Sequence, residues 1–113
     1  MWVFSKIGFV SVVAHRELKG MLLVRARLRE DLEHVAARLT EAGVTGVECE
    51  ESPQADYRFR LVCPRAAMAE LLKSLTNEID YDNFKNSVHG NPVRDQAYMS
   101  CWSAMHAAQV SGK

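Results

Sequence analysis

The sequence lacks a long apolar run. No stretch approaches the roughly 20 apolar residues of a membrane-spanning helix, and the first residues lack the basic, apolar and small-residue order of a signal peptide. Cysteine is scarce, with three in 113 residues at wide spacing. An odd number of distant cysteines is not the framework of a disulfide-stabilised secreted domain. We therefore expect a cytoplasmic protein with no membrane association.

Short catalytic and metal-binding motifs are also missing. The chain has no CxxC or HExxH pattern and no glycine-rich phosphate loop. Its histidines, at positions 15, 34, 89 and 106, show no paired spacing. Cys49 and Cys63 alternate with polar neighbours and are expected to face the core, where thiols are inert. We expect no metal, no cofactor and no catalytic residue.

The charges balance to zero but are unevenly distributed. Residues 1–29 carry six Lys or Arg against one acid, residues 30–56 carry one against eight, and residues 57–113 carry seven against five. A neutral total argues against a general nucleic-acid binder, which usually has a basic excess. The separation still allows a basic patch and an acidic patch that face each other within one chain or across a dimer.

A strand–helix pattern occurs twice in the middle of the chain. Arginine-containing strands are predicted over 21–28 and 57–63, and each runs into an amphipathic helix, over about 30–42 and 64–79. Displacing the first copy by 36 residues superimposes the apolar helix positions. The matched positions are Leu32 with Met68, Val35 with Leu71, Ala36 with Leu72, and Leu39 with Leu75.

The remaining elements complete a ββαββαα order. Strands are predicted over 9–15 and 46–50, with a further short strand over 2–4 as a weaker candidate. Residues 80–85 are expected to break and restart the chain, with a short helix through Val88 and a last helix over 94–110. We predict one α+β domain over 1–113, an antiparallel or mixed four-stranded sheet with two helices on one face and a C-terminal helix. This order is that of a circularly permuted ferredoxin-like sandwich, in which strand 57–63 lies parallel to strand 21–28.

Alternation along the two central strands predicts a cluster of arginines. Side chains of a strand point alternately to its two faces, and the apolar set must face the helices. That set contains Val24, Ala26, Leu28, Tyr57, Phe59, Leu61 and Cys63. The opposite set contains Arg25, Arg27, Arg58 and Arg60. Because guanidinium groups match phosphate and carboxylate, these four residues are a candidate anion-binding site.

Two alternatives to this site remain open. In the first, the arginines pair with Glu48 and Glu50 on a solvated face; in the second, the C-terminal helix covers them. Ser11 and His15 are candidates to join the face from the other side. A sheet that binds RNA carries aromatic rings on the same face for base stacking. Since Tyr57 and Phe59 are predicted to point the other way, nucleic acid is not an expected partner.

A second candidate surface lies in the aromatic C-terminal region. Its predicted interaction residues are Tyr81, Phe84, Arg94, Tyr98 and Trp102. Amphipathic aromatic residues, Met and Arg are enriched at protein interfaces, and Met99 and Met105 would add adaptable contacts. The alternative is that these rings close the end of the core.

The tail resembles the end of a family of small uncharacterised bacterial proteins. The resemblance is carried by IDYDNFKNSV at 79–88 and RDQAYMSCWSAM at 94–105, and the opening MWVF at 1–4 and GFVSVV at 8–13 are similar as well. It implies a bacterial or phage-related cytosolic protein. No activity accompanies the family, so no functional residue is assigned through it.

Three hypotheses for function follow. The first is a non-enzymatic protein-interaction or regulatory module that acts as a homodimer through its aromatic C-terminal region. The second is a binder of an anionic ligand or nucleic acid that uses the four arginines. The third is a small enzyme on a ferredoxin-like scaffold, which hosts many unrelated chemistries.

Overall fold

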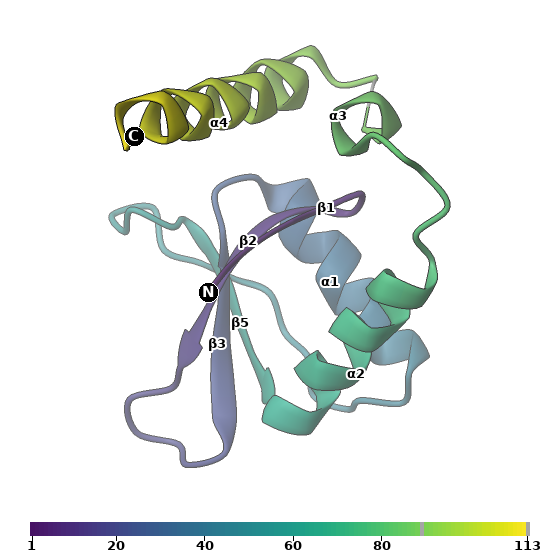
Figure 1. The fold of residues 1–113 in the computed structure, drawn as a ribbon. Coiled ribbons are helices and arrows are strands. Elements are labelled where there is room, and N and C mark those ends of the chain that lie inside the picture. Colours follow the sequence, from purple (N-terminus) through teal and green to yellow (C-terminus); the bar gives the residue numbers. More distant parts are fainter. Residues whose placement is uncertain (89, 113) are drawn as a thin grey trace. The chain divides into compact units, whose positions relative to one another are not determined.

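A computed structural model describes residues 1–88 and 90–112 of the chain. The chain divides into two compact units, Met1–Ile79 and Asp80–Lys113. The first unit contains a sheet with two helices, and the second is helical (Figure 1). Each unit is described by itself.

The first unit is built on a five-stranded antiparallel sheet in the order β1-β2-β3-β5-β4. The strands are β1 (Trp2–Ser5), β2 (Gly8–Ala14), β3 (Met21–Ala26), β4 (Glu50–Glu51) and β5 (Phe59–Pro64). The predicted number of four strands is wrong, because β1 forms a full hairpin with β2. The strand expected over 46–50 is reduced to two residues, Glu50 and Glu51.

The central pair of strands runs antiparallel, so the predicted parallel pairing is wrong. Val24 of β3 lies opposite Leu61 of β5, and β4 is antiparallel to β5. Therefore β3 and β4 run in the same direction and flank β5. The helix after β3 leads the chain to β4, and the turn over 52–58 then reverses it into β5. The duplicated pattern in the sequence does not reveal this reversal.

Two helices pack on one face of the sheet, as the sequence predicts. They are α1 (Arg29–Glu41) and α2 (Arg65–Asn77), which lie side by side in Figure 1. The first turn of α1 carries Glu30 and Asp31, where negative charge favours the positive end of the helix dipole. After its last turn the chain leaves through Gly43 at φ 91°, a conformation that glycine adopts at low cost.

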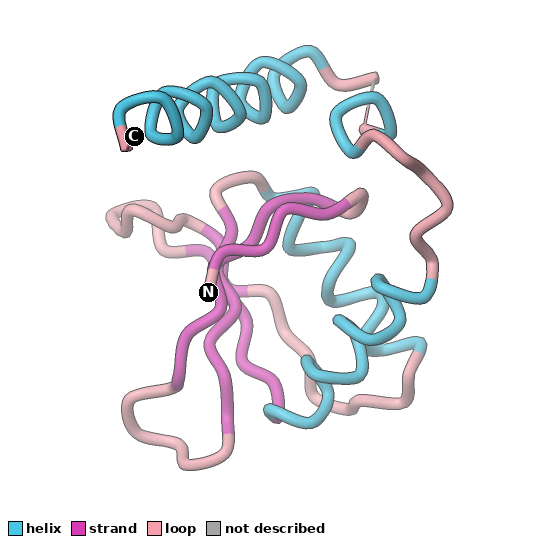
Figure 2. The backbone as a smooth tube through the Cα atoms, in the orientation of Figure 1, coloured by secondary structure: helices cyan, strands magenta, loops and turns pink. Residues whose placement is uncertain are grey.

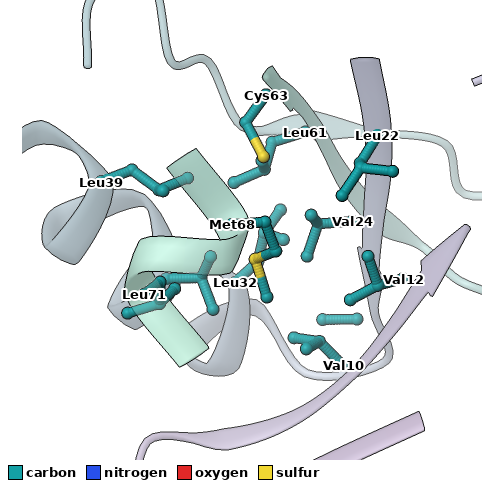
Figure 3. Close-up of a cluster of buried hydrophobic side chains, with 12 residues drawn as sticks. Val10, Val12, Leu22, Val24, Leu32, Leu39, Leu61, Cys63, Met68 and Leu71 are labelled. Atoms are coloured by element: carbon teal, nitrogen blue, oxygen red, sulfur yellow. The ribbon is translucent and has the colours of Figure 1, made fainter. Parts of the chain in front are cut away.

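The core lies between this helix pair and one face of β2, β3 and β5. Figure 3 shows Met68 and Leu71 of α2 pointing toward Val24 and Leu61 of the sheet. The buried cluster alternates along each strand, as expected for a sheet covered on one side. Its members are Val10, Val12, Leu22, Val24, Ala26, Leu32, Val35, Leu39, Leu61, Cys63, Met68 and Leu71. The intervening strand residues consequently lie on the face opposite α1 and α2. We call it the helix-free face, because neither of these two helices of the first unit lies on it.

The second unit consists of α3 (Phe84–Ser87) and α4 (Pro92–Ser111), joined by a short connection (Figure 2). Asparagine side chains begin both helices, as N-caps commonly do. Asn83 Oδ1 accepts a hydrogen bond from the Asn86 N–H, and Asn91 Oδ1 accepts from Val93 and Arg94. Within the described residues, no helix has the length and apolar character to cross a membrane.

We predict that Gly8→Ala destabilises the first unit by about 3 kcal/mol. Gly8 has φ 131°, and a Cβ placed there would overlap the buried Asp31 carboxylate, whose Oδ2 accepts the Phe9 N–H at 3.0 Å. Backbone strain and overpacking each cost about 1–3 kcal/mol. Urea denaturation measures the loss. Gly20→Ala is the matched control, because Gly20 also has positive φ but would meet no atom within 4 Å. Equal losses for both variants would contradict the proposed collision.

Candidate functional site

One row of side chains crosses all five strands on the helix-free face. In register order it contains Trp2 of β1, Ser11 of β2, Arg25 of β3, Arg60 of β5 and Glu50 of β4. Because cross-strand partners share a face, these side chains emerge on the same side of the sheet. The sheet therefore places Arg25 and Arg60 directly opposite each other at its centre.

Three of the four predicted arginines contact one tyrosine, two at its ring and one at its main-chain oxygen. The guanidinium carbon of Arg25 lies 4.5 Å from the centroid of the Tyr57 ring, and that of Arg27 lies 4.3 Å away. Arg60 Nη2 donates to the Tyr57 carbonyl oxygen at 3.3 Å. We call Arg25, Arg27 and Arg60 the arginine cluster. Its cations are held by the quadrupole of an aromatic ring and by neutral acceptors.

Carboxylates do not neutralise the arginine cluster. Arg25 Nη2 donates to Ser11 Oγ at 3.0 Å, and Arg27 Nη1 donates to the main-chain oxygen of Asp56 at 2.9 Å. Across residues 1–88 and 90–112, none of the three cluster arginines forms an ion pair. The buried Nε atoms of Arg25 and Arg60 also have no hydrogen-bond acceptor there. The cluster thus holds concentrated positive charge with unused donors.

Arg58 does not join the cluster. Its Nε donates to Glu51 Oε2 at 2.7 Å, while Arg29 Nη2 donates to Glu51 Oε1 at 2.8 Å. Both guanidiniums also lie over the Phe59 ring. Together they hold the pKa of the Glu51 carboxyl below its ordinary value, chiefly through the Arg58 hydrogen bond. Arg58 therefore belongs to a surface charge network at the far edge of the sheet.

Tyr57 lies with the arginines, which overturns its predicted orientation. Strand β5 begins at Phe59, and Tyr57 precedes it in an irregular bend. The period of two that predicts facing applies only inside a strand, so it could not be extended to Tyr57. Phe59, inside the strand, does pack against the core as predicted.

The predicted pairing of arginines with Glu48 and Glu50 is wrong in its residues. Glu48 lies outside the strands, and Glu50 is the register partner of Arg60 without forming an ion pair within the described chain. The acid that pairs is Glu51, as described above. At the other side, His15 turns into its own loop, where Nδ1 accepts the N–H groups of Glu17 and Leu18 at 3.1 and 3.0 Å.

An aromatic edge on the helix-free face was not identified from the sequence. The Phe4 and Phe9 rings stack with centroids 4.4 Å apart, and Trp2 meets Phe9 edge-on at 5.9 Å. The sequence signal for this edge is that Trp2 and Phe4 are two residues apart and therefore share a face of β1, on which a hairpin pairs Phe4 with Phe9. This aromatic edge (Trp2, Phe4 and Phe9) shares its face with Ser11 and Arg25.

The second unit brings most of its predicted interaction residues into ring contacts. Phe84 stacks on Tyr98 with centroids 5.7 Å apart and meets Tyr81 at 6.0 Å. Lys85 Nζ lies 4.5 Å from the centroid of the Trp102 ring. Arg94 lies at the start of α4, where its N–H donates to the Asn91 cap.

Cys49 and Cys63 lack the lowered thiol pKa of an activated nucleophile. Cys63 is buried as predicted, and burial raises the pKa of its thiol. Cys49 is exposed, so its predicted core position is wrong, and its thiol pKa is also raised, by desolvation and then by Glu33. In the described ranges, no group of three or more His, Cys, Asp or Glu residues is placed to hold a metal. His89 lies outside the described residues.

Comparison with known proteins gives no assignment: no family model, no curated protein and no solved structure matches this chain.

We predict that Arg58→Gln raises the pKa of the Glu51 carboxyl toward its ordinary value, because the largest cause of its depression is removed. NMR titration of the side-chain carboxyl carbon measures this change. The stabilisation from a depressed acid is present above its unfolded pKa and is lost as pH falls through the folded pKa. Arg65→Gln, a charge-matched change on α2, should leave the Glu51 titration unaltered. An unchanged Glu51 pKa in the Arg58 variant would contradict the network.

Proposed function

We propose that this protein is a non-enzymatic binding module that holds an anionic ligand on its helix-free face. The observation that carries the proposal is the arginine cluster, whose three cations surround Tyr57 without a carboxylate partner. Guanidinium groups donate several hydrogen bonds in a planar fork that matches phosphate and carboxylate oxygens. Ser11 adds a hydroxyl beside Arg25.

The local environment strengthens an anion site of this kind. Arg25 and Arg60 are only partly exposed, and their Nε donors are buried without acceptors in the described chain. Partly buried charges are screened less by salt than fully exposed ones, and an unsatisfied donor costs about 1–3 kcal/mol until an acceptor reaches it. A bound anion would offset the repulsion between the facing arginines.

We further propose that β2-β3-β5-β4 with α1 and α2 is a circularly permuted ferredoxin-like sandwich, with β1 as an added edge strand. The supporting feature is the β3-α1-β4 crossover, whose parallel strands are separated by β5. Such scaffolds host many functions, so the function rests on the site. A cytoplasmic location in a bacterium is part of this proposal, supported by the three free cysteines and by the resemblance of the tail.

We expect Arg60→Gln and Arg25→Gln each to weaken anion binding about tenfold at low salt. A hydrogen bond to a charged group contributes about 1.5–3 kcal/mol, and about 1.4 kcal/mol corresponds to tenfold in affinity. Fluorescence anisotropy with labelled inorganic polyphosphate, and separately with labelled poly-glutamate, measures the effect. Arg65→Gln removes the same charge from α2 and serves as the control. If neither probe binds, or if all three variants bind equally, the proposal fails.

A second candidate function is self-association through α4. Residues 96–111 contain no Asp, Glu, Lys or Arg, although all residues of α4 from Met99 onward are exposed. Trp102 is 49% exposed and Met105 is 71% exposed. A symmetric dimer places the same patch of both copies together, so an uncharged helix avoids opposing like charges there. This favours a second copy of the chain as the partner of α4.

We predict that the protein is a dimer and that Met105→Glu converts it to a monomer. Each copy would then carry a carboxylate into an apolar, self-facing contact, where an unpaired charge is costly. Light scattering coupled to size exclusion gives the mass. Gln96→Glu introduces the same charge on the opposite side of α4, since nine residues are about two and a half turns, and should leave the dimer intact. A monomeric wild-type protein at high concentration would rule out self-association through α4.

A further inference from the structure

We propose that the anion held on the helix-free face is single-stranded nucleic acid, with a base stacked on Trp2 and phosphates on the arginine cluster. This inference rests on the proposed anion-binding function and narrows it to one class of ligand. It follows from the aromatic edge, which lies on the same face as the cluster.

The aromatic edge presents an accessible ring on a fixed support. The Trp2 side chain is 68% exposed, and its ring rests edge-on against Phe9, which in turn stacks on Phe4. Nucleic-acid bases stack on exposed aromatic rings of this kind, and the interaction tolerates any sequence because every base has a π-face. Trp2 is therefore the residue assigned to base stacking.

The spacing between ring and cations suits a short nucleic-acid strand. Ser11 is the register partner of both Trp2 and Arg25, so these two residues are two strands apart. At about 4.8 Å per strand, their Cα atoms are about 10 Å apart. A stacked strand advances about 3.4 Å per nucleotide, so about three nucleotides cover this distance. Arg60 lies one strand further, about 14 Å from Trp2, so a segment of about four nucleotides can place a base on Trp2 and phosphates on Arg25 and Arg60.

The same face disfavours a duplex and limits the affinity. A stacking contact with Trp2 needs unpaired bases, which a single strand offers and a duplex does not. The chain has no net charge, so binding depends on the local cluster alone. Two or three phosphate contacts predict a slope of log affinity against log salt of about −1.4 to −2.1, since each contact on a single strand contributes about −0.7.

The test compares two labelled strands of equal length, an octameric oligouridylate and its abasic counterpart, by fluorescence anisotropy in low salt. We expect the base-bearing strand to bind more tightly than the abasic one. Trp2→Ala should weaken binding of the base-bearing strand about tenfold and leave abasic binding unchanged, while Trp2→Phe should restore most of the loss. Leu18→Ala, which removes a 51% exposed apolar side chain from the loop between β2 and β3, is the control and should have no effect.

The outcomes separate this inference from the proposed function. Equal binding of both strands, with loss in Arg60→Gln, would identify a base-free anion as the ligand and overturn the inference while the anion site stands. Binding of poly-glutamate but of neither strand would overturn it in favour of an acidic protein partner. If no anion binds, both proposals fail. Thermal melts of each variant measure whether Trp2→Ala remains folded. If Trp2→Ala unfolds, the comparison of the two strands with the wild-type protein and with Trp2→Phe still tests base stacking.

Discussion

The register between β3 and β5 is the constraint on which the rest of the first unit depends. It pairs Val24 with Leu61 on the helix-covered face and, one residue later, Arg25 with Arg60 on the opposite face. A slip of one residue would exchange these faces and bury arginines beneath α1 and α2. The apolar core therefore fixes where the cations lie, and the position of the arginine cluster is a consequence of how the core packs.

That arrangement carries a local cost which the surrounding residues reduce. Like charges directly opposite on neighbouring strands are destabilising, and here no carboxylate of the described chain forms an ion pair with either guanidinium. Neutral groups contact the guanidiniums instead. The Tyr57 ring and the Ser11 hydroxyl contact Arg25, and the Tyr57 main-chain oxygen accepts a hydrogen bond from Arg60. Sites that keep such local conflicts while the core beneath is well packed are typical of binding sites. The buried apolar residues around Val24 contribute stability that offsets the repulsion between Arg25 and Arg60.

Most elements of the fold could be predicted from the sequence, because their apolar periods are strong. The spacing of Leu32, Val35 and Leu39 indicates α1, and alternation from Leu22 to Ala26 indicates β3. The pairing direction could not be predicted in this way, since periodicity describes each element alone. The deciding feature is the β4–β5 hairpin, and β4 has only two residues, too few to give a period. The α+β class was therefore recovered, whereas the strand count and the parallel pairing were not.

The candidate site shows the same division between local and tertiary information. Arg25 and Arg60 follow from alternation inside strands, but Tyr57 and Arg58 precede β5, where no period applies, and tertiary contacts direct each differently. This matters for the ligand, because net charge and the supposed absence of aromatic rings both argued against nucleic acid. The structure removes the second argument through Trp2, Phe4 and Phe9. The net charge of the chain governs long-range attraction, whereas a ligand that contacts only the arginine cluster responds to the local electrostatic field. A neutral chain can therefore carry a site for a polyanion, with weaker binding that decreases moderately as salt rises.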